Sequence, residues 1–241
     1  MYKTNLLLSQ KYLSIIKHCI VIAVVLSLNI DFAVAQVTNL SPGKERWEIK
    51  TSVPEHSRHF FVSIDTLLML PSPIMDYSHQ LYNTKRIPNK VSFGNLQLQE
   101  GDIITTRAYV HLVALEKDKK GADGDYHIQV LSGNQWTDSC LIIEVPYPEF
   151  VKDPALKEQI EKVRNFVNKH LLENKYYKTK GLVIDPPLYV NITGQLFFDG
   201  NHYKQSLKGK YRGKSDHKTK RTMKSYTLWE LHPVTEMKKV K

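Results

Sequence analysis

Apolar and polar residues alternate over two neighbouring stretches in the middle of the chain. Residues 102–115, DIITTRAYVHLVAL, are rich in β-branched and apolar side chains, and DYHIQVLSG follows after a turn between Gly121 and Gly124. This pattern predicts two antiparallel strands. A third strand is predicted in SCLIIEVPYP and ends at Pro146 and Pro148, which have no amide hydrogen to donate to a neighbouring strand.

The spacing of the apolar residues then changes from two to between three and four. Asp153 is placed to cap a helix whose first residue is Pro154. The apolar positions that follow predict one buried helical face: Leu156, Ile160, Val163, Phe166, Val167 and Leu171. Two further strands are predicted after this helix, in LYVNITGQLFF and in YTLWELHPV.

The order strand, strand, strand, helix, strand, strand is that of the OB-fold. This fold class is mainly β, a five-stranded Greek-key barrel with one helix between strands three and four. An open α+β sheet has the same elements and is the alternative. Alternation places these residues inside the barrel: Val110, Leu112, Ala114, Tyr126, Ile128, Val130, Val190, Ile192, Leu196 and Phe198. Gly194 is expected to mark a bulge or a tight bend.

The amino-terminal residues have the features of a secretory signal peptide. Three lysines and no acidic residue precede the apolar stretch CIVIAVVLSLNI, and the small-x-small sequence Ala33-Val34-Ala35 follows. We therefore expect residues 1–35 to be removed near Ala35, which leaves a secreted, periplasmic or envelope protein without a transmembrane helix. An uncleaved anchor is the alternative. After the signal peptide, residues 36–100 are expected to form an extension packed on the barrel of residues 101–241.

Six phrases in the chain are ERWEIKTS, GDIITTRAYVHLVALE, GDYHIQV, CLIIEVPYPEF, GQLFFDGNHY and TLWELHPVTEM. Together these phrases resemble a group of uncharacterised secreted bacterial proteins with an OB-fold-like barrel. The resemblance covers most of the chain that follows the signal peptide. It implies the barrel and a bacterial envelope or extracellular setting, and it implies no particular activity.

Histidines occupy comparable places on several predicted strands. The alternation directs His111 outward on the first strand and His127 and Gln129 outward on the second. His202 follows the fourth strand. His232 ends the fifth strand, which we expect to close against the first strand near His111.

These four histidines are candidate metal ligands. Imidazoles with Asp125, Asp199 or Glu230 nearby suit zinc or another transition metal. The candidates come from different elements, however, and lack the short local spacing of established zinc motifs. Hydrogen bonding at the surface is the simpler explanation, so we expect neither a bound metal nor another cofactor.

Sequence motifs for catalysis are missing from the chain. There is no G-x-S-x-G, no H-E-x-x-H and no glycine-rich phosphate loop that opens a helix. Cys140 begins an apolar strand, where a packed thiol is commoner than a nucleophile. Some nucleases use an OB-type barrel with arginines beside the phosphate, but Arg107 is the only arginine in the predicted strands. A metal-dependent hydrolase or nuclease using the histidines is therefore only an alternative. A structural envelope protein is another.

Positive charge is concentrated in one loop. The chain has a formal net charge of +10, and residues 199–225 hold nine basic residues against Asp199 and Asp216, a net of +7. In OB-folds this connection borders the ligand-binding face. We expect its cations to neutralise phosphates and its tyrosines to stack on bases or sugars. The predicted ligand contacts are Lys204, Lys208, Lys210, Arg212, Lys214, Lys218, Arg221, Tyr203 and Tyr211, with His127 and Gln129 on the barrel.

The function predicted from these observations is that of a secreted, non-catalytic OB-fold protein that binds a polyanion. Nucleic acid is the simplest polyanion, and an acidic glycan or an anionic envelope lipid offers similar charge. A disordered, solvated loop is the alternative for residues 199–225. In either case we expect that deletion of residues 204–221 leaves the barrel folded, because this stretch has few apolar residues.

The signal peptide gives the first testable prediction. Protein exported from a bacterial host should begin at Gln36 and be soluble, because the small residues before it form a signal peptidase site. Intact-mass measurement distinguishes this product from the chain of 241 residues. Recovery of the full-length chain in the membrane fraction would contradict the prediction.

Overall fold

The computed structural model describes residues 46–74, 84–116, 123–137, 139–173, 181–216 and 219–240. Contacts within the chain divide it into Met1–Ser41 and Pro42–Lys241, and all the described residues belong to the second unit. The expected signal peptide and Lys218 lie outside the described residues. Within the part that is described, no helix is both long enough and apolar enough to cross a membrane.

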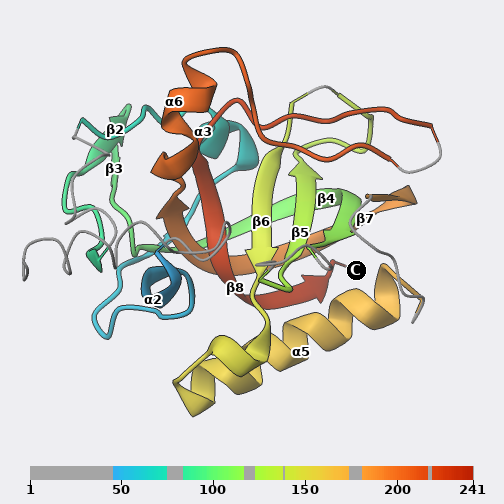
Figure 1. Ribbon diagram of the computed structural model, residues 1–241, viewed down its shortest axis with the longest axis horizontal. Coiled ribbons are helices and arrows are strands. Elements are labelled where there is room, and N and C mark those ends of the chain that lie inside the picture. The colour runs from blue at the N-terminus through green and yellow to red at the C-terminus, as the bar shows by residue number, and fades with distance from the viewer. Residues whose placement is uncertain are drawn as a thin grey trace, which may run out of the picture. The chain divides into compact units, whose positions relative to one another are not determined.

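Five strands form a closed barrel, which confirms the predicted OB-like fold (Figure 1). The strands are β4 Ile103–Leu115, β5 Tyr126–Leu131, β6 Leu141–Val145, β7 Leu182–Phe198 and β8 Trp229–Lys239. Their order is β4-β5-β6-β8-β7, and β7 pairs with β4 to close the barrel. β6 and β8 are parallel, and the other pairs are antiparallel.

This strand order corrects one expectation about closure. The fourth strand of the barrel, β7, closes against the first strand, β4. The fifth strand, β8, lies between β6 and β7. The expected approach of His232 to His111 is therefore wrong, because the two residues are on strands that are not neighbours.

The helix α5, Pro154–His170, begins where its sequence predicts. The side chain of Asp153 accepts a hydrogen bond from the amide of Leu156 at 2.8 Å and so satisfies one of the free donors of the first turn. A short 3-10 helix, η1, Pro148–Phe150, precedes it. The helix packs on β6 and β8 with one apolar face, made of Leu156, Ile160, Val163 and Val167.

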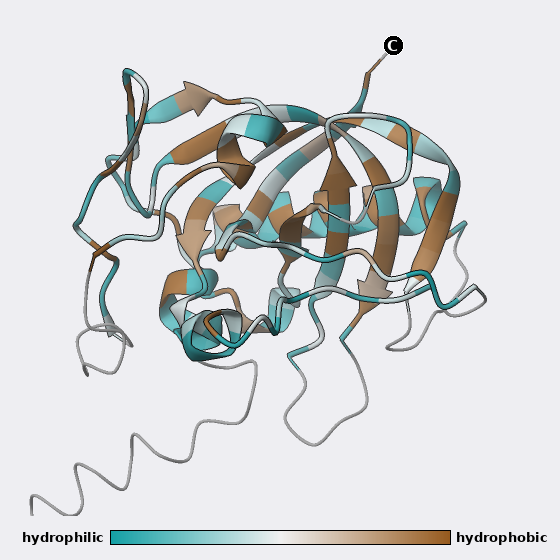
Figure 2. Cartoon of the chain, turned by 90° about the horizontal axis from the view of Figure 1, so that it is seen from above, coloured by the Kyte–Doolittle hydropathy of each residue, from teal (hydrophilic) through white to brown (hydrophobic). Residues whose placement is uncertain are grey.

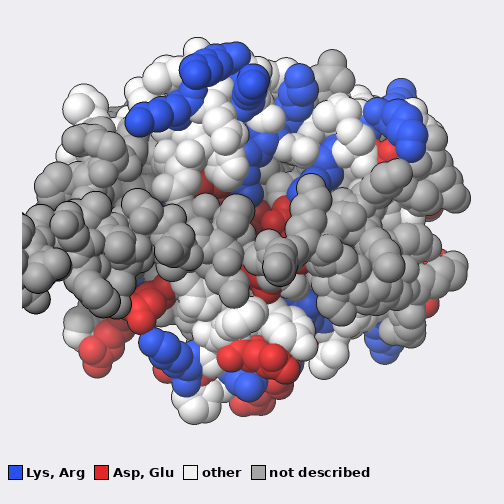
Figure 3. Space-filling view, in the orientation of Figure 1, with Lys and Arg blue, Asp and Glu red and all other residues white. Residues whose placement is uncertain are grey.

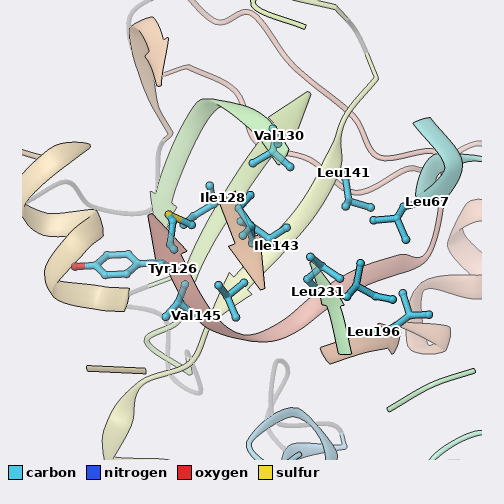
Figure 4. Close-up of a cluster of buried hydrophobic side chains, with 14 of the residues drawn as sticks. Leu67, Tyr126, Ile128, Val130, Leu141, Ile143, Val145, Leu196 and Leu231 are labelled. Carbon is cyan, nitrogen blue, oxygen red and sulfur yellow. The ribbon is translucent and has the colours of Figure 1, made fainter. Parts of the chain in front are cut away.

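The barrel interior is filled by apolar side chains from all five strands. Figure 4 shows Ile128 and Val130 of β5, Ile143 of β6 and Leu231 of β8 pointing toward one another. Hydrophobic residues are accordingly concentrated on the strands (Figure 2). Each such side chain stabilises the fold by about 1.5–3 kcal/mol on burial, so packing holds the barrel closed.

A bulge in β4 changes which residues face this core. The register of β4 against both β5 and β7 shifts between Val110 and Leu112. Beyond the shift, Val113 and Leu115 belong to the main core, whereas Leu112 and Ala114 do not. The expected alternation is wrong for this half of the strand, because one extra residue reverses inward and outward positions.

Gly194 marks an irregular point in β7, as predicted. The register against β8 shifts on both sides of this residue. A Cβ at this position would lie 2.9 Å from the carbonyl oxygen of Pro233 and 3.2 Å from the Cβ of Leu231. Only glycine permits this close approach, which lets one long strand pair with both β4 and β8.

The described residues before the barrel pack on it. They form α2 Trp47–Lys50, β1 His59–Phe61, α3 Ile64–Leu68, β2 Val91–Phe93 and β3 Leu96–Leu98. β1 pairs in parallel with β4, and β2 and β3 form a hairpin. Apolar residues such as Leu67 and Leu98 join the core of the barrel. Arg46 and Glu100 form a fully buried ion pair with contacts of 2.5 and 2.6 Å, which ties the start of this segment to its end.

A core substitution tests the barrel register. Ile128 is 0% exposed, and its replacement by alanine should lower the free energy of unfolding by about 2–5 kcal/mol because it leaves a cavity. Leu207, which is 70% exposed, is the matched control, and Leu207→Ala should change stability by about 0.5 kcal/mol or less. Denaturant unfolding measures both values. Equal losses would mean that the assignment of inward positions is wrong.

Candidate functional site

The connection between β7 and β8, residues 199–228, is folded against the barrel. It contains η2, Gly200–His202, and α6, Tyr203–Ser206, followed by two antiparallel arms. The bridged pairs of the arms are Arg212–Ser225 and Ser215–Thr222. The arms approach so closely that a Cβ on Gly213 would lie 2.0 Å from the carbonyl oxygen of Met223. The described residues of this connection are therefore folded into short helices and two bridged arms.

Beneath the connection lies a group of charged and histidine side chains, called here the polar cluster. Its members are Lys50, Glu116, Asp123, Asp125, His127, Glu144, Asp199, Arg212, Lys214, Glu230 and His232. Several of them point outward from β5, β6 and β8. In an OB-fold the outer face of strands two and three, here β5 and β6, carries the ligand site. Figure 3 shows acidic side chains at the centre of this view and basic side chains above them, over the connection.

Arg212 holds the connection to the barrel. Its guanidinium contacts Glu144 of β6 at 2.8 Å, Asp199 at 2.6 Å and Glu230 of β8. The arginine side chain is 15% exposed, and the three carboxylates are at most 4% exposed. Burial alone would lower the pKa of Arg212, but the three carboxylates raise it well above its usual range. The sequence predicted a ligand contact at this position, and the structure instead places an internal counterion there.

Gln129 and Met223 form a second attachment. The side-chain amide of Gln129 donates to the carbonyl oxygen of Met223 at 2.9 Å, and its oxygen accepts from the amide of Lys214 at 2.6 Å. The same side-chain nitrogen lies 3.1 Å from the sulfur of Cys140. Met223 is fully buried against Leu131 and Cys140. Gln129 was predicted to face a ligand, and in the structure its hydrogen-bonding atoms contact the connection.

His127 and His232 both contact Glu144. Nδ1 of His127 lies 3.0 Å from Oε1 of Glu144, and Nδ1 of His232 lies 3.0 Å from Oε2. His232 also approaches Glu230 through Nδ1 and Asp125 through Nε2, each at 3.5 Å. The sequence predicted that His127 faces outward, but both histidines are buried, and the connection covers this face.

Burial and mutual charge shift the pKa values of the polar cluster strongly. Burial raises the pKa of Asp125 to about 8 and that of Asp123 to about 6. Burial alone would lower the pKa of His232, but its contacts with Glu144 and Glu230 raise it to about 9. Burial alone would raise the pKa of Glu144, but Arg212 and the two histidines hold it well below its usual value. Neutral pH thus favours a charged Glu144 beside a protonated His232.

The remaining predicted histidines are separate from this arrangement. Nε2 of His111 contacts the carbonyl oxygen of Gly133 at 2.9 Å, and its ring meets Trp136 edge to face. Burial lowers the pKa of His111. His202 contacts Asp199 at 2.7 Å, at the edge of the polar cluster. Of the four candidates, the structure brings His127 and His232 onto one carboxylate and leaves His111 apart.

The solvent side of the connection is basic and aromatic. Its exposed cations include Lys204, Lys208, Lys210, Arg221 and Lys224, and none of these five has an acidic partner among the described residues. Tyr211 packs edge to face against the exposed Tyr226 with 4.6 Å between ring centroids. Arg221 lies over the ring of Trp136 at 5.6 Å. Tyr203, a predicted stacking residue, instead packs against the core, and Lys214 contacts Glu116 at 2.5 Å.

Several members of the polar cluster were not among the predicted site residues. Glu144 lies in the middle of the apolar run LIIEV, where a single carboxylate in a buried strand was a usable signal. Lys50 reaches the cluster from α2, and no local pattern indicates this contact. Although burial alone would lower the pKa of Lys50, the charges of Glu144, Asp199 and Glu230 raise it.

The fold and this geometry define an OB-like barrel in which the basic connection covers the outer face of β5 and β6 and a buried ionic cluster beneath it. Comparisons of the chain with protein-family models, with curated proteins and with solved structures give no match.

Arg212 provides a stability test. Arg212→Met should lower the free energy of unfolding by about 3–5 kcal/mol, because it leaves buried carboxylates without their counterion. Deletion of residues 204–221 removes the same guanidinium, so we now expect this deletion to destabilise the barrel as well. The matched control is Lys210→Met, an exposed position two residues earlier, which should have little effect. Denaturant unfolding measures the stability of both variants. Equal free energies of unfolding for the two variants would show that the arginine is not a structural counterion.

Proposed function

We propose that this protein is a non-catalytic OB-like binding protein that acts outside the cytoplasm and engages a polyanion, most simply nucleic acid. The observation that supports this proposal most directly is that the cations of the β7–β8 connection fall into two groups, one facing the barrel and one facing solvent. Arg212 and Lys214 face the barrel, whereas Lys208, Lys210 and Lys224 face solvent. The inner cations fix the connection, so the outer cations are presented on a preorganised surface.

The aromatic residues on this surface fit the same ligand. Tyr211, Tyr226 and Trp136 lie among the exposed cations. Aromatic rings stack on unpaired bases with little base preference, and lysines neutralise phosphates without reading sequence. We therefore expect binding to single strands with little sequence specificity.

The geometry gives less support to a hydrolase. Asp125 and His232 are 0% exposed and Glu144 is 2% exposed, so a polymeric substrate does not reach them while the connection covers this face. A catalytic metal site also keeps one coordination position open to water or substrate. We accordingly place the ligand on the connection and not in the polar cluster.

Salt dependence tests the proposal. Affinity for a single-stranded oligonucleotide should fall with salt, with a log-log slope of about −0.7 for each phosphate contacted. Replacement of Lys208, Lys210 and Lys224 by glutamine should weaken binding and reduce the slope by about 2 in magnitude. The measurement is oligonucleotide affinity by fluorescence anisotropy at several salt concentrations.

A control variant with the same net charge uses Lys152, Lys162 and Lys169, which are exposed on or beside α5. Their replacement by glutamine should leave the slope unchanged. An acidic polysaccharide competitor and anionic vesicles serve as the other polyanions. No oligonucleotide binding at low salt would remove nucleic acid, and tighter binding to the polysaccharide or to the vesicles would assign the same surface to that ligand.

A further inference from the structure

The polar cluster contains more buried negative charge than its permanent cations offset. Its carboxylates are Glu116, Asp123, Asp125, Glu144, Asp199 and Glu230, and its permanent cations are Lys50, Arg212 and Lys214. Arg164 adds a fourth positive charge near Asp125, although its guanidinium donates to main-chain carbonyls. The described residues therefore leave about two negative charges that need protons or a bound cation. Buried charges without compensation are costly, so the deficit needs a physical explanation.

Several polar atoms in the cluster have no hydrogen-bond partner in the described part of the chain. They include Oδ2 of Asp125, Oε1 of Glu230 and both ring nitrogens of His232, which approach one another or Glu144 at 3.0–3.5 Å without the geometry of a hydrogen bond. All three residues are at most 1% exposed. Buried polar groups are normally satisfied, so atoms of this kind that face one another indicate a missing ligand.

We propose that Asp125, Glu144 and His232 bind one divalent transition-metal ion, Zn²⁺ or Mn²⁺, beneath the β7–β8 connection. Their ligand atoms lie within 4.8 Å of one another. Zinc bonds of about 2.0–2.2 Å place tetrahedral ligand atoms about 3.3 Å apart, so the side chains must move closer together to hold an ion. One imidazole with carboxylates suits a first-row ion better than Ca²⁺ or Mg²⁺, which prefer oxygen ligands alone. The charge of such an ion equals the deficit of the cluster.

A second group, Glu116, His127 and Glu144, has similar spacing but is the poorer site. Lys214 lies 2.5 Å from Glu116, and Arg212 lies 2.8 Å from the Glu144 oxygen that faces His127. Permanent cations thus already contact both carboxylates of this group. In the proposed site, Oε2 of Glu144 lies 3.0 Å from Nδ1 of His232 and Oδ2 of Asp125 lies 3.5 Å from Nε2, and neither oxygen forms an ion pair with a lysine or arginine of the described residues.

The burial of the proposed site indicates a structural ion. Asp125 directly precedes β5, Glu144 lies on β6 and His232 lies on β8. An ion held by them links the strands that carry the ligand face of an OB-fold. This inference goes beyond the proposed polyanion binding, because the exposed lysines are not involved in it.

Metal content measures the proposal directly. The purified chain is stripped with a chelator, equilibrated with Zn²⁺ or Mn²⁺, and dialysed, and bound metal is measured by elemental analysis. About one ion per chain should be retained, and Mg²⁺ and Ca²⁺ should bind much more weakly. The bound ion should also raise the melting temperature, because it binds only the folded state.

Matched variants locate the ion. Asp125→Asn keeps the size of the side chain and an oxygen for the amide of Tyr147, and it should weaken metal affinity at least about tenfold. Asp123→Asn removes a buried carboxyl two residues away, keeps an oxygen for the amide of Asp125, and should weaken metal affinity clearly less than Asp125→Asn does. His111→Ala checks for unspecific binding by the other histidines and should retain the ion. Melting curves without metal show whether each variant is folded.

Two outcomes would overturn the proposal. One is retention of less than about 0.1 ion per folded chain, which would mean that protons on Asp125 and His232 supply the missing charge. The other is equal loss of affinity in the Asp125→Asn and Asp123→Asn variants. Oligonucleotide binding by the metal-free protein is measured in parallel, so that failure of this proposal is distinguished from failure of polyanion binding.

Discussion

The ion contacts of Arg212 with Glu144, Asp199 and Glu230 are the interaction on which the outer half of this structure depends. The apolar interior of the barrel comes mainly from the strands, and Leu228 and Tyr203 of the connection also pack against it. Arg212 adds a charged attachment on the other side of the strands. Together with the contacts of Gln129, this attachment holds the described residues of the largely polar connection against the barrel. The exposed cations on the connection are thereby fixed above the buried cluster.

The fold was largely predictable because it depends on local patterns that survive in the sequence. Strand alternation, the cap at Asp153 and the glycine at position 194 each predicted the observed element. The register of β4 was predicted correctly only up to Val110. The bulge that follows depends on how β4 pairs with β5 and β7. The alternation pattern within one strand contains no information about that pairing.

The candidate site was predictable only in part. Sequence placed His127, Gln129 and the basic loop at one face, and the structure packs the loop on that face through Gln129. His232 was expected beside His111 and lies instead beside Glu144. The roles of Gln129 and Arg212 were not foreseen, because a cation in a polar loop and a polar residue on a strand read as solvent-exposed. Their partners are 11 to 94 residues away in the chain, and contacts over such separations leave no periodic signal.

The position of Cys140 beneath the connection has a chemical consequence for the whole protein. Its sulfur is 0% exposed and lies against Met223 and Gln129, and burial raises the pKa of this thiol to about 12. The thiolate is the species that attacks disulfides, so almost none of the reactive form exists at neutral pH. An exposed thiol at this position could form disulfide bonds between copies of the chain in an oxidising medium. By burying Cys140, the connection keeps its thiol protonated and out of contact with oxidants and other thiols.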